Sequence, residues 1–383
     1  MYNRMFNKTV FIRTYPGCRS IQMVPNIPLG SSSSSKSKEV LDSADQPVSD
    51  FDTSLLTPQL SRFIASKIKS YQTNDQVQVI LLASKDVDHF CYGIDKGLYV
   101  DGKTAQLADA VAAVHELSAT IDNLSNNAKK PIISILGGDA NGSGVAPFLG
   151  ATYRLGTAST QLCIDELLHG HLPVGGLAHR FINCGRGRGS TEMLRYAAIT
   201  ARPLYADDLY MYGAITHVVG DRPDDTLGDI LWRTIPEIEY GSVQKDMVAV
   251  DHLPQLLEAM HIGTPQTFMW GDDVSDFAGW DHLLLAKPDQ LEDGDALMSL
   301  TGESALESIE DIEKHVRQCF RHESKEEIVA ALRGKKGRWA ADALAKIEAI
   351  DPSLLADWLL LTRSSQDLTL QEALSLEKEL LKQ

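Results

Sequence analysis

Lys130-Pro-Ile-Ile-Ser-Ile-Leu-Gly-Gly-Asp-Ala-Asn-Gly-Ser-Gly144 is the stretch that decides the fold. Its apolar part, residues 131–136, is rich in β-branched side chains and predicts a buried strand. The glycines that follow permit positive φ and a close approach of the backbone to a ligand. Residues 145–150 can then begin a helix, whose free N–H groups face this turn. The pattern suits the binding of negative charge, and a tight structural turn explains it equally well.

A second stretch, residues 162–176, has the order Leu-Cys-Ile-Asp-Glu-Leu-Leu-His-Gly-His-Leu-Pro-Val-Gly-Gly. With the first stretch it resembles the crotonase (enoyl-CoA hydratase/isomerase) superfamily, which has K-P, then G-x-x-x-G-G-G, then P-E-T-x-I-G-x-x-P-D-V-G-G at these positions. Residues 89–95, His-Phe-Cys-Tyr-Gly-Ile-Asp, match the family's F-C-A-G-G-D loop. Residues 206–219 match its A-x-x-x-G-hydrophobic-x-x-H-x-V segment.

The C-terminal part looks most like one branch of this superfamily, the 3-hydroxyisobutyryl-CoA hydrolases, in residues 319–328, 351–353 and 370–377. The resemblance implies an α/β fold: a crotonase-like spiral of ββα repeats with a helical C-terminal region. We expect four segments in the chain: a basic arm at 1–38, a crotonase-like core at 39–225, an acidic insertion at 226–304 and the helical C-terminal region at 305–383.

The resemblance also implies a site for a coenzyme A thioester, with no metal and no other cofactor. In this family two backbone N–H groups, one from each glycine loop, hold the acyl oxygen, and these positions are Ile94 and Ser143 here. The catalytic carboxylate of the family corresponds to Glu166. The glycines expected to line the substrate are Gly93, Gly142 and Gly144.

Both glycine loops depart from the family pattern. Ile94 and Ser143 stand where the family has glycine or another small residue, and Tyr92 also replaces a small residue. An added Cβ does not remove an N–H group, but it narrows the path by which the thioester approaches.

The carboxylate side of the expected site departs as well. Asp165 replaces the proline beside Glu166, and its negative charge would tend to raise the pKa of that glutamate. The aspartate of P-D-V-G-G is absent, because Pro173 is followed directly by Val174. The hydrolases continue with an F-x-E-G-V-R-A segment that covers the active site, whereas this sequence ends at Gln383. These departures predict weak hydrolysis or none.

Helix signals flank the expected core. Thr57-Pro58 has the cap-then-proline signature of a helix start, and Leu60, Ile64 and Ile68 follow at helical spacing. Ser190 can cap a second helix, with Glu192 in its first turn.

The N-terminal segment, residues 1–38, is basic and rich in serine. It holds six cations and no acid, a composition typical of a mitochondrial transit segment, although an ordinary basic tail has it too. Since these cations contribute +6 to a net charge of −16, the remainder carries −22. That charge excludes general nucleic-acid binding by the body of the protein, because phosphate contacts require clustered Lys and Arg.

Residues 251–313 hold fifteen acidic side chains and one basic one, Lys287. A run of like charge is usually a solvated face, but Trp270 and Trp280 lie among these residues and favour docking on a basic protein partner, since aromatic residues are enriched at interface centres. Arg186 and Arg188 lie in a glycine-rich loop and can meet phosphate, although a solvated loop explains them equally well. RNA contact is therefore expected only at the basic arm and at this loop.

Several function classes are excluded by pattern. No apolar run approaches the length of about 20 residues that crosses a bilayer. The five cysteines show no C-x-x-C pair and read as free thiols of a reducing compartment. The second glycine loop lacks the lysine of a P-loop, and Ser143 does not lie in a G-x-S-x-G elbow.

Two functions remain. The first is a catalytically degenerate hydrolase homologue that serves as a structural component of the mitochondrial small ribosomal subunit, where several lineages carry a component resembling this hydrolase. Its partners would be mitochondrial ribosomal proteins of the matrix, with limited rRNA contact and no membrane. The alternative is an active mitochondrial 3-hydroxyisobutyryl-CoA thioester hydrolase of valine catabolism, with Glu166 as base or nucleophile. The missing Asp and the altered loops favour the first function.

Overall fold

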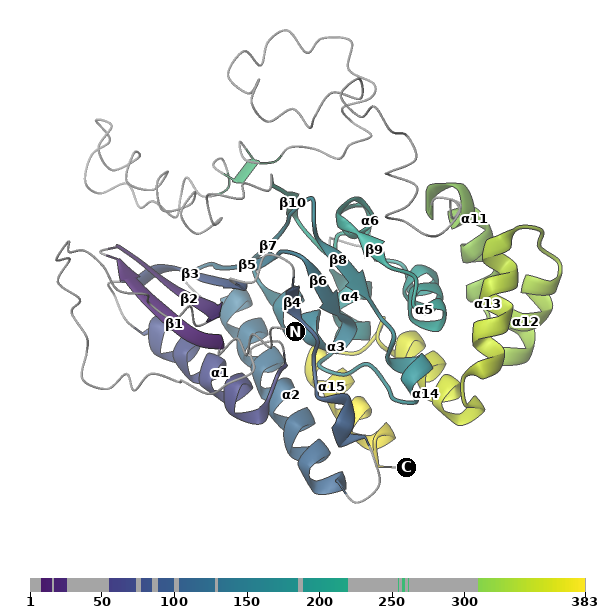
Figure 1. The fold of residues 1–383 in the computed structure, drawn as a ribbon, viewed down its shortest axis with the longest axis horizontal. Helices are drawn as coiled ribbons and strands as arrows, with labels where there is room; N and C mark the ends of the chain where they lie inside the picture. Colours follow the sequence, from purple (N-terminus) through teal and green to yellow (C-terminus); the bar gives the residue numbers. More distant parts are fainter. Residues whose placement is uncertain are drawn as a thin grey trace, which may run out of the picture.

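A computed structural model describes most of the chain (Figure 1). The described residues are 8–15, 17–25, 55–73, 77–84, 89–99, 103–127, 130–184, 189–219, 254, 257–258, 261 and 309–382, with the backbone alone at 8–25, 77–79 and 310–311. Nearly all of the expected acidic insertion, including Trp270 and Trp280, lies outside this set, as do Arg186 and Arg188.

The larger of two sheets has six strands in the order β1-β2-β3-β5-β7-β10. An antiparallel hairpin opens it, and all further pairings are parallel. The strands are β1 (Lys8–Tyr15), β2 (Gly17–Pro25), β3 (Val77–Ser84), β5 (Ile132–Leu136), β7 (Tyr153–Gly156) and β10 (His217–Val218). The hairpin lies within the expected basic arm, and the basic composition of residues 1–38 did not predict it.

The smaller sheet has four strands in the order β4-β6-β8-β9. Its first three strands are parallel, and the last is antiparallel to its neighbour. They are β4 (His89–Cys91), β6 (Asp139–Asn141), β8 (Gln161–Cys163) and β9 (Leu204–Tyr205). Three strands of the large sheet, β3, β5 and β7, are each followed by one strand of the small sheet, and each pair then leads to helical structure. The predicted ββα repeats are thus confirmed.

Two long helices cover one face of the large sheet (Figure 1). They are α1 (Pro58–Gln72) and α2 (Thr104–Asn127), which pack against each other. Thr57 caps α1 by accepting a hydrogen bond from the Leu60 N–H at 3.2 Å, as the sequence predicted. The predicted apolar stripe of α1 is buried, which fixes the face that this helix turns to the core.

Shorter helical elements connect the sheets to the C-terminal region. Their bounds are η1 (Lys96–Leu98), α3 (Gly142–Val145), η2 (Ala146–Gly150), η3 (Glu166–His169), α4 (Leu177–Asn183), α5 (Thr191–Thr200) and α6 (Ala206–Met211). Ser190 caps α5 through the Met193 N–H, again as predicted.

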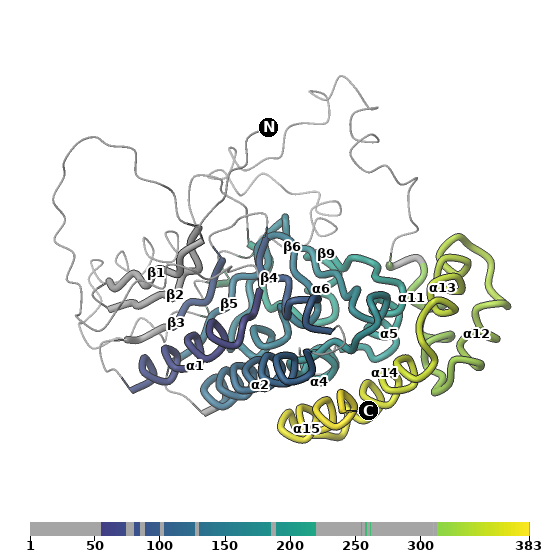
Figure 2. The backbone as a smooth tube through the Cα atoms, turned by 60° about the horizontal axis from the view of Figure 1, so that its bottom comes forward, coloured from purple at the N-terminus to yellow at the C-terminus, as the bar shows by residue number. Residues whose placement is uncertain are grey.

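The C-terminal region is helical, as predicted. It consists of α11 (Ile309–Phe320), α12 (Lys325–Arg333), α13 (Arg338–Ala349), α14 (Pro352–Ser364) and α15 (Leu370–Leu380). Helices α11 to α13 gather at one end of the molecule, while α14 and α15 run back beneath the core to reach α4 and α2 (Figure 2). The last helix therefore reaches the Gly175-Gly176 turn, 201 residues away in sequence.

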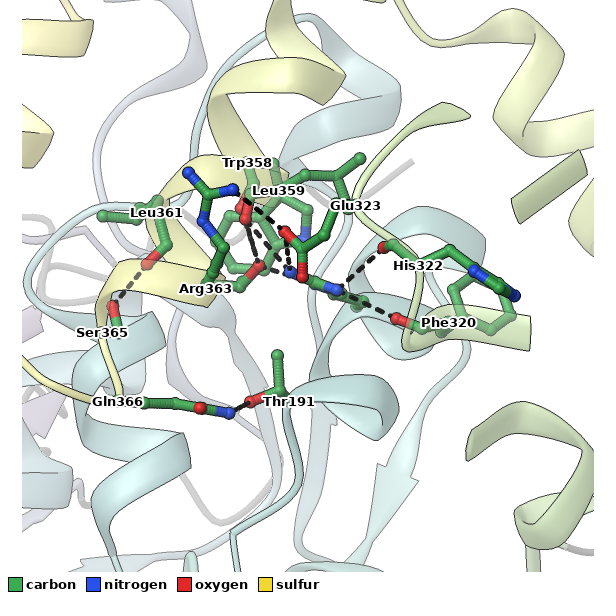
Figure 3. Close-up of polar contacts among 12 residues, drawn as sticks. Thr191, Phe320, His322, Glu323, Trp358, Leu359, Leu361, Arg363, Ser365 and Gln366 are labelled. Atoms are coloured by element: carbon green, nitrogen blue, oxygen red, sulfur yellow. Dashed lines mark hydrogen bonds and ion pairs between the residues drawn. The ribbon is translucent and has the colours of Figure 1, made fainter. Parts of the chain in front are cut away.

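A buried arginine on α5 joins this region to the core. The Arg195 guanidinium, 1% exposed, donates to the backbone oxygens of Phe320, His322 and Leu359 at 3.0–3.2 Å. It also donates to the Thr362 hydroxyl at 2.8 Å. Figure 3 labels the three residues whose backbone oxygens accept from the guanidinium. One side chain thus satisfies acceptors on α14 and at the end of α11.

Candidate functional site

The first glycine loop (residues 91–94) and the second glycine loop (residues 141–144) lie directly against each other. Gly93 has φ +78°, and a Cβ built on it would lie 2.9 Å from the Gly144 backbone nitrogen. A Cβ at Gly144 would lie 2.6 Å from the Gly93 nitrogen and would collide with the Cys91 carbonyl oxygen. The glycines at these two positions are therefore required by contact between the loops, whatever they also do for a ligand.

Glu166 lies beneath the second loop at the start of η3. Its side chain is 3% exposed, and Oε1 accepts a hydrogen bond from the Ser143 N–H at 2.7 Å. A Cβ at Gly142 would lie 3.0 Å from both carboxylate oxygens, so the loop and the carboxylate are in contact. The structure thus brings Glu166 to the very N–H group that the family resemblance assigns to the thioester oxygen.

The two expected oxyanion positions, Ser143 and Ile94, both make contacts within the protein. The Ser143 hydroxyl accepts from the Val174 N–H at 3.0 Å, which ties the loop to the Pro-Val-Gly-Gly turn. Ile94, the other expected oxyanion position, is buried in the main core. Both departures from the family pattern therefore have structural partners in this chain.

Burial raises the pKa of the Glu166 carboxyl above its ordinary value, and the hydrogen bond from the Ser143 N–H opposes that rise. The charge of Asp165 raises this pKa too, but it is the smallest of the causes. The predicted direction is confirmed, and the effect is small because the charge of Asp165 has partners of its own. Its carboxylate pairs with Lys96 at 2.8 Å and with His169 at 3.0 Å.

Sequence reasoning missed a stacked aromatic pair beside this carboxylate. Tyr99 and His171 have ring centroids 3.8 Å apart with planes 15° apart. Burial lowers the pKa of His171 to about 4, and burial followed by the Glu166 charge raises that of Tyr99. At neutral pH both rings are therefore uncharged, and neither His171 ring nitrogen has a hydrogen-bond partner among the described residues. The Gly-His-Leu-Pro order gave no signal of this stacking, because Tyr99 lies on a different loop.

A second buried carboxylate, Glu377, reaches the site from α15. Its oxygens accept from the Gly175 N–H at 3.0 Å, the Gly176 N–H at 3.0 Å and His115 Nε2 at 2.9 Å. The sequence marked Glu377 only as part of a family-like helix. The structure shows that this carboxylate fastens the last helix to the Pro-Val-Gly-Gly turn.

We expect loss of charge at these two carboxylates to change the free energy of unfolding in opposite directions. The pKa of Glu166 is raised on folding, so the folded protein favours the protonated carboxyl. The contribution of this group to the free energy of unfolding is therefore fully present below the pKa of the unfolded carboxyl, and it is lost as pH rises through the folded pKa. Glu166→Gln should therefore raise the free energy of unfolding at pH 8, and the gain should shrink toward pH 4. Glu377→Gln should lower it by about 1.5–3 kcal/mol, because an amide nitrogen would face backbone donors.

Urea denaturation of both variants at pH 8 and pH 5, followed by tryptophan fluorescence, measures this contrast. The two changes are chemically identical and both sites are buried, so each variant is the control for the other. Equal destabilisation by both substitutions would contradict the assignment of Glu166 as an under-compensated charge.

Among the residues that the structure describes, no three or more His, Cys, Asp or Glu side chains come together in a group that could hold a metal ion. Within the same residues, no helix has the length and apolar character to span a bilayer.

The comparisons with known proteins agree with this architecture. The enoyl-CoA hydratase/isomerase family model matches residues 53–250. No curated protein sequence matches the chain. A carnitinyl-CoA dehydratase from Mycobacterium thermoresistibile superposes with a TM-score of 0.62 at 17% identity, over 98% of this chain and 86% of that one. An enoyl-CoA hydratase from Rhodobacter sphaeroides gives 0.59 at 16% identity, over 97% and 84%. The chain belongs to the enoyl-CoA hydratase/isomerase family and has its crotonase-like α/β fold.

Proposed function

We propose that this protein is a catalytically degenerate, hydrolase-like crotonase that serves as a structural component of the mitochondrial small ribosomal subunit. The observation that carries the degenerate part is the 2.7 Å hydrogen bond from the Ser143 N–H to the Glu166 carboxylate. The N–H group that should receive the thioester oxygen is donated to the protein's own anion.

An N–H group has one hydrogen, and a bond to a carboxylate is roughly twice as strong as one between neutral groups. A thioester oxygen at the same place would have to displace Glu166. The negative charge that develops on that oxygen would also lie close to the carboxylate, and two like charges about 4 Å apart repel by about 4 kcal/mol at an effective dielectric of 20. Such a group opposes the transition state that an oxyanion hole must stabilise.

The ribosomal part of the proposal rests on sequence. The basic, acid-free composition of residues 1–38 suits import into mitochondria, and the acidic residues 251–313 suit docking on basic proteins. A component resembling 3-hydroxyisobutyryl-CoA hydrolase also occurs in mitochondrial small subunits of several lineages. These features together favour a scaffold over an enzyme.

The second candidate is an active 3-hydroxyisobutyryl-CoA hydrolase. It is favoured by the position of Glu166, which is buried, has a raised pKa and lies against the second glycine loop. A carboxyl with a raised pKa is suited to proton transfer near neutral pH. Rotation of its side chain away from Ser143 would free the N–H group.

Sedimentation of the native protein through a sucrose gradient separates these functions. We expect the tagged full chain in a mitochondrial extract to migrate with the small ribosomal subunit, and Glu166→Gln to migrate identically. A matrix enzyme of the same superfamily, followed in the same gradient, should stay near the top. Recovery of this protein near the top, at the position of a free 42.0 kDa chain or a small oligomer, would refute the ribosomal role.

A further inference from the structure

The loop between α12 and α13, residues 333–338, reads Arg-Gly-Lys-Lys-Gly-Arg. Four cations therefore lie within six residues, and no Asp or Glu occurs between residues 328 and 341. This local charge is unexpected on a chain whose net charge is −16. The sequence-based expectation that positive charge gathers only in the N-terminal arm and around Arg186 and Arg188 overlooked this loop.

Two of the four cations have no partner among the residues that the structure describes. Arg333 and Lys336 are exposed, and neither makes an ion pair or hydrogen bond to any residue that the structure describes. The loop also approaches neighbouring helices through a neutral side chain: Lys335 Nζ contacts Gln318 Oε1 at 2.6 Å. The positive charge of the loop is therefore not cancelled by these contacts.

The described carboxylates of the adjacent helices have other partners or lie away from the loop. Glu313 on α11 pairs with Arg317 at 2.7 Å. Asp342 on α13 pairs with Lys346 at 3.1 Å. The acids of α12, Glu326 and Glu327, lie in its first turn, at the end of that helix opposite to the loop.

The loop is also held in place, which lowers the entropy cost of binding. Lys335 reaches His315 Nδ1 at 3.4 Å as well as Gln318, both on α11. His315 stacks in parallel on Trp339, with ring centroids 6.4 Å apart and planes 11° apart, and Trp339 is buried. A cation cluster that is already positioned loses less conformational freedom when it meets a ligand.

The position of the loop leaves room for a large partner. Helices α11 to α13 form the end of the molecule opposite to α1 and α2 in both views (Figures 1 and 2). Within the loop, a Cβ built on Gly334 would meet only the Ala331 carbonyl oxygen, at 3.5 Å. The space beside Gly334 is therefore open, next to the flanking cations.

We propose that the 333–338 loop binds the phosphate backbone of an RNA strand. Each nucleotide of an RNA strand carries one phosphate charge, so a cluster of this size meets several phosphates at once and releases their counterions. Arginine adds a planar fork of donors that matches phosphate oxygens. Contacts to the phosphate backbone do not read the base sequence, so the affinity should not depend on the sequence of the RNA. That the strand is RNA rests on the proposed function, whereas phosphate as the ligand rests on the loop.

Fluorescence anisotropy of the purified full chain with a labelled single-stranded RNA of mixed sequence, from 50 to 200 mM KCl, tests this inference. The double variant Arg333→Gln, Lys336→Gln should weaken binding about tenfold at 100 mM KCl and reduce the salt slope by about 1.4. The matched control, Arg62→Gln, Lys69→Gln, changes the same residue types by the same charge. Both of its side chains are exposed and paired with carboxylates on α2, so binding should change less than twofold.

Equal weakening by the two variants, or an unchanged salt slope, would overturn the inference, and thermal melts verify that both remain folded. Tighter binding of polyglutamate than of RNA would also overturn the inference. So would binding of anionic phospholipid vesicles that the loop variant abolishes while its RNA binding persists. Normal co-sedimentation with unaltered RNA binding by the loop variant would reject the loop but not the proposed function. Loop-dependent RNA binding without co-sedimentation would reject the proposed function but not the loop.

Discussion

Purified protein should hydrolyse 3-hydroxyisobutyryl-CoA with a turnover below about 10⁻² s⁻¹. Loss of one oxyanion-hole donor lowers a rate by about 10²–10³, and misplaced acid–base groups lower it by a further ~10²–10⁴. Here the Ser143 N–H is donated to Glu166, and the same contact keeps the expected base on the N–H group rather than on a substrate. Both losses therefore follow from one geometry.

Release of free coenzyme A, measured with a thiol reagent, gives this rate. An active thioesterase added to the same mixture verifies the assay, and Glu166→Gln provides the matched protein without the carboxylate. Its residual rate should equal that of the natural sequence. Turnover above about 1 s⁻¹ that Glu166→Gln abolishes would be an ordinary enzyme value and would establish the hydrolase instead.

Replacement of Arg195 by methionine should destabilise the protein by about 3–5 kcal/mol, because several buried acceptors would lose their donor and each costs about 1–3 kcal/mol when left unsatisfied. The guanidinium donates to three backbone oxygens and the Thr362 hydroxyl (Figure 3). Methionine fills much of the same volume but leaves these buried acceptors without a donor. Helices α11 to α14 should therefore separate from α5 more easily in this variant than in a variant with a substitution on the surface.

Guanidinium chloride denaturation and limited trypsin digestion measure this loss. Arg62→Met is the matched control, because Arg62 is an exposed arginine on α1 whose pair with Asp109 lies in solvent, where such pairs contribute little. Arg195→Lys should fall between the two, since one ammonium cannot reach all four acceptors. A loss in Arg195→Met no larger than in Arg62→Met would mean that the network does not hold the C-terminal helices.

Local sequence determined much of the fold. A short apolar run rich in β-branched residues predicted β5, and the Thr57-Pro58 and Ser190 signatures located two helix starts correctly. These features depend on side-chain period and on caps within four residues, so a linear reading contains them. The order of the family motifs also located both glycine loops. In the structure each loop follows a strand of the small sheet.

Tertiary structure alone decided which groups of the site are joined by hydrogen bonds. Ser143 and Glu166 are 23 residues apart, and Gly176 and Glu377 are 201 apart, yet each pair shares a hydrogen bond. The sequence could identify Glu166 but not the N–H group that donates a hydrogen bond to it, because that hydrogen bond depends on how two loops from different repeats pack.

The same limit applies to the larger architecture. The β1–β2 hairpin lies in a segment whose composition predicted an arm, since strand pairing with β3 outweighs local composition. The role of Arg195 depends on carbonyl groups more than 120 residues away, and backbone acceptors leave no mark in a sequence. The sequence thus determined the repeats and the residue types of the site, and long-range packing decided which donor meets which acceptor.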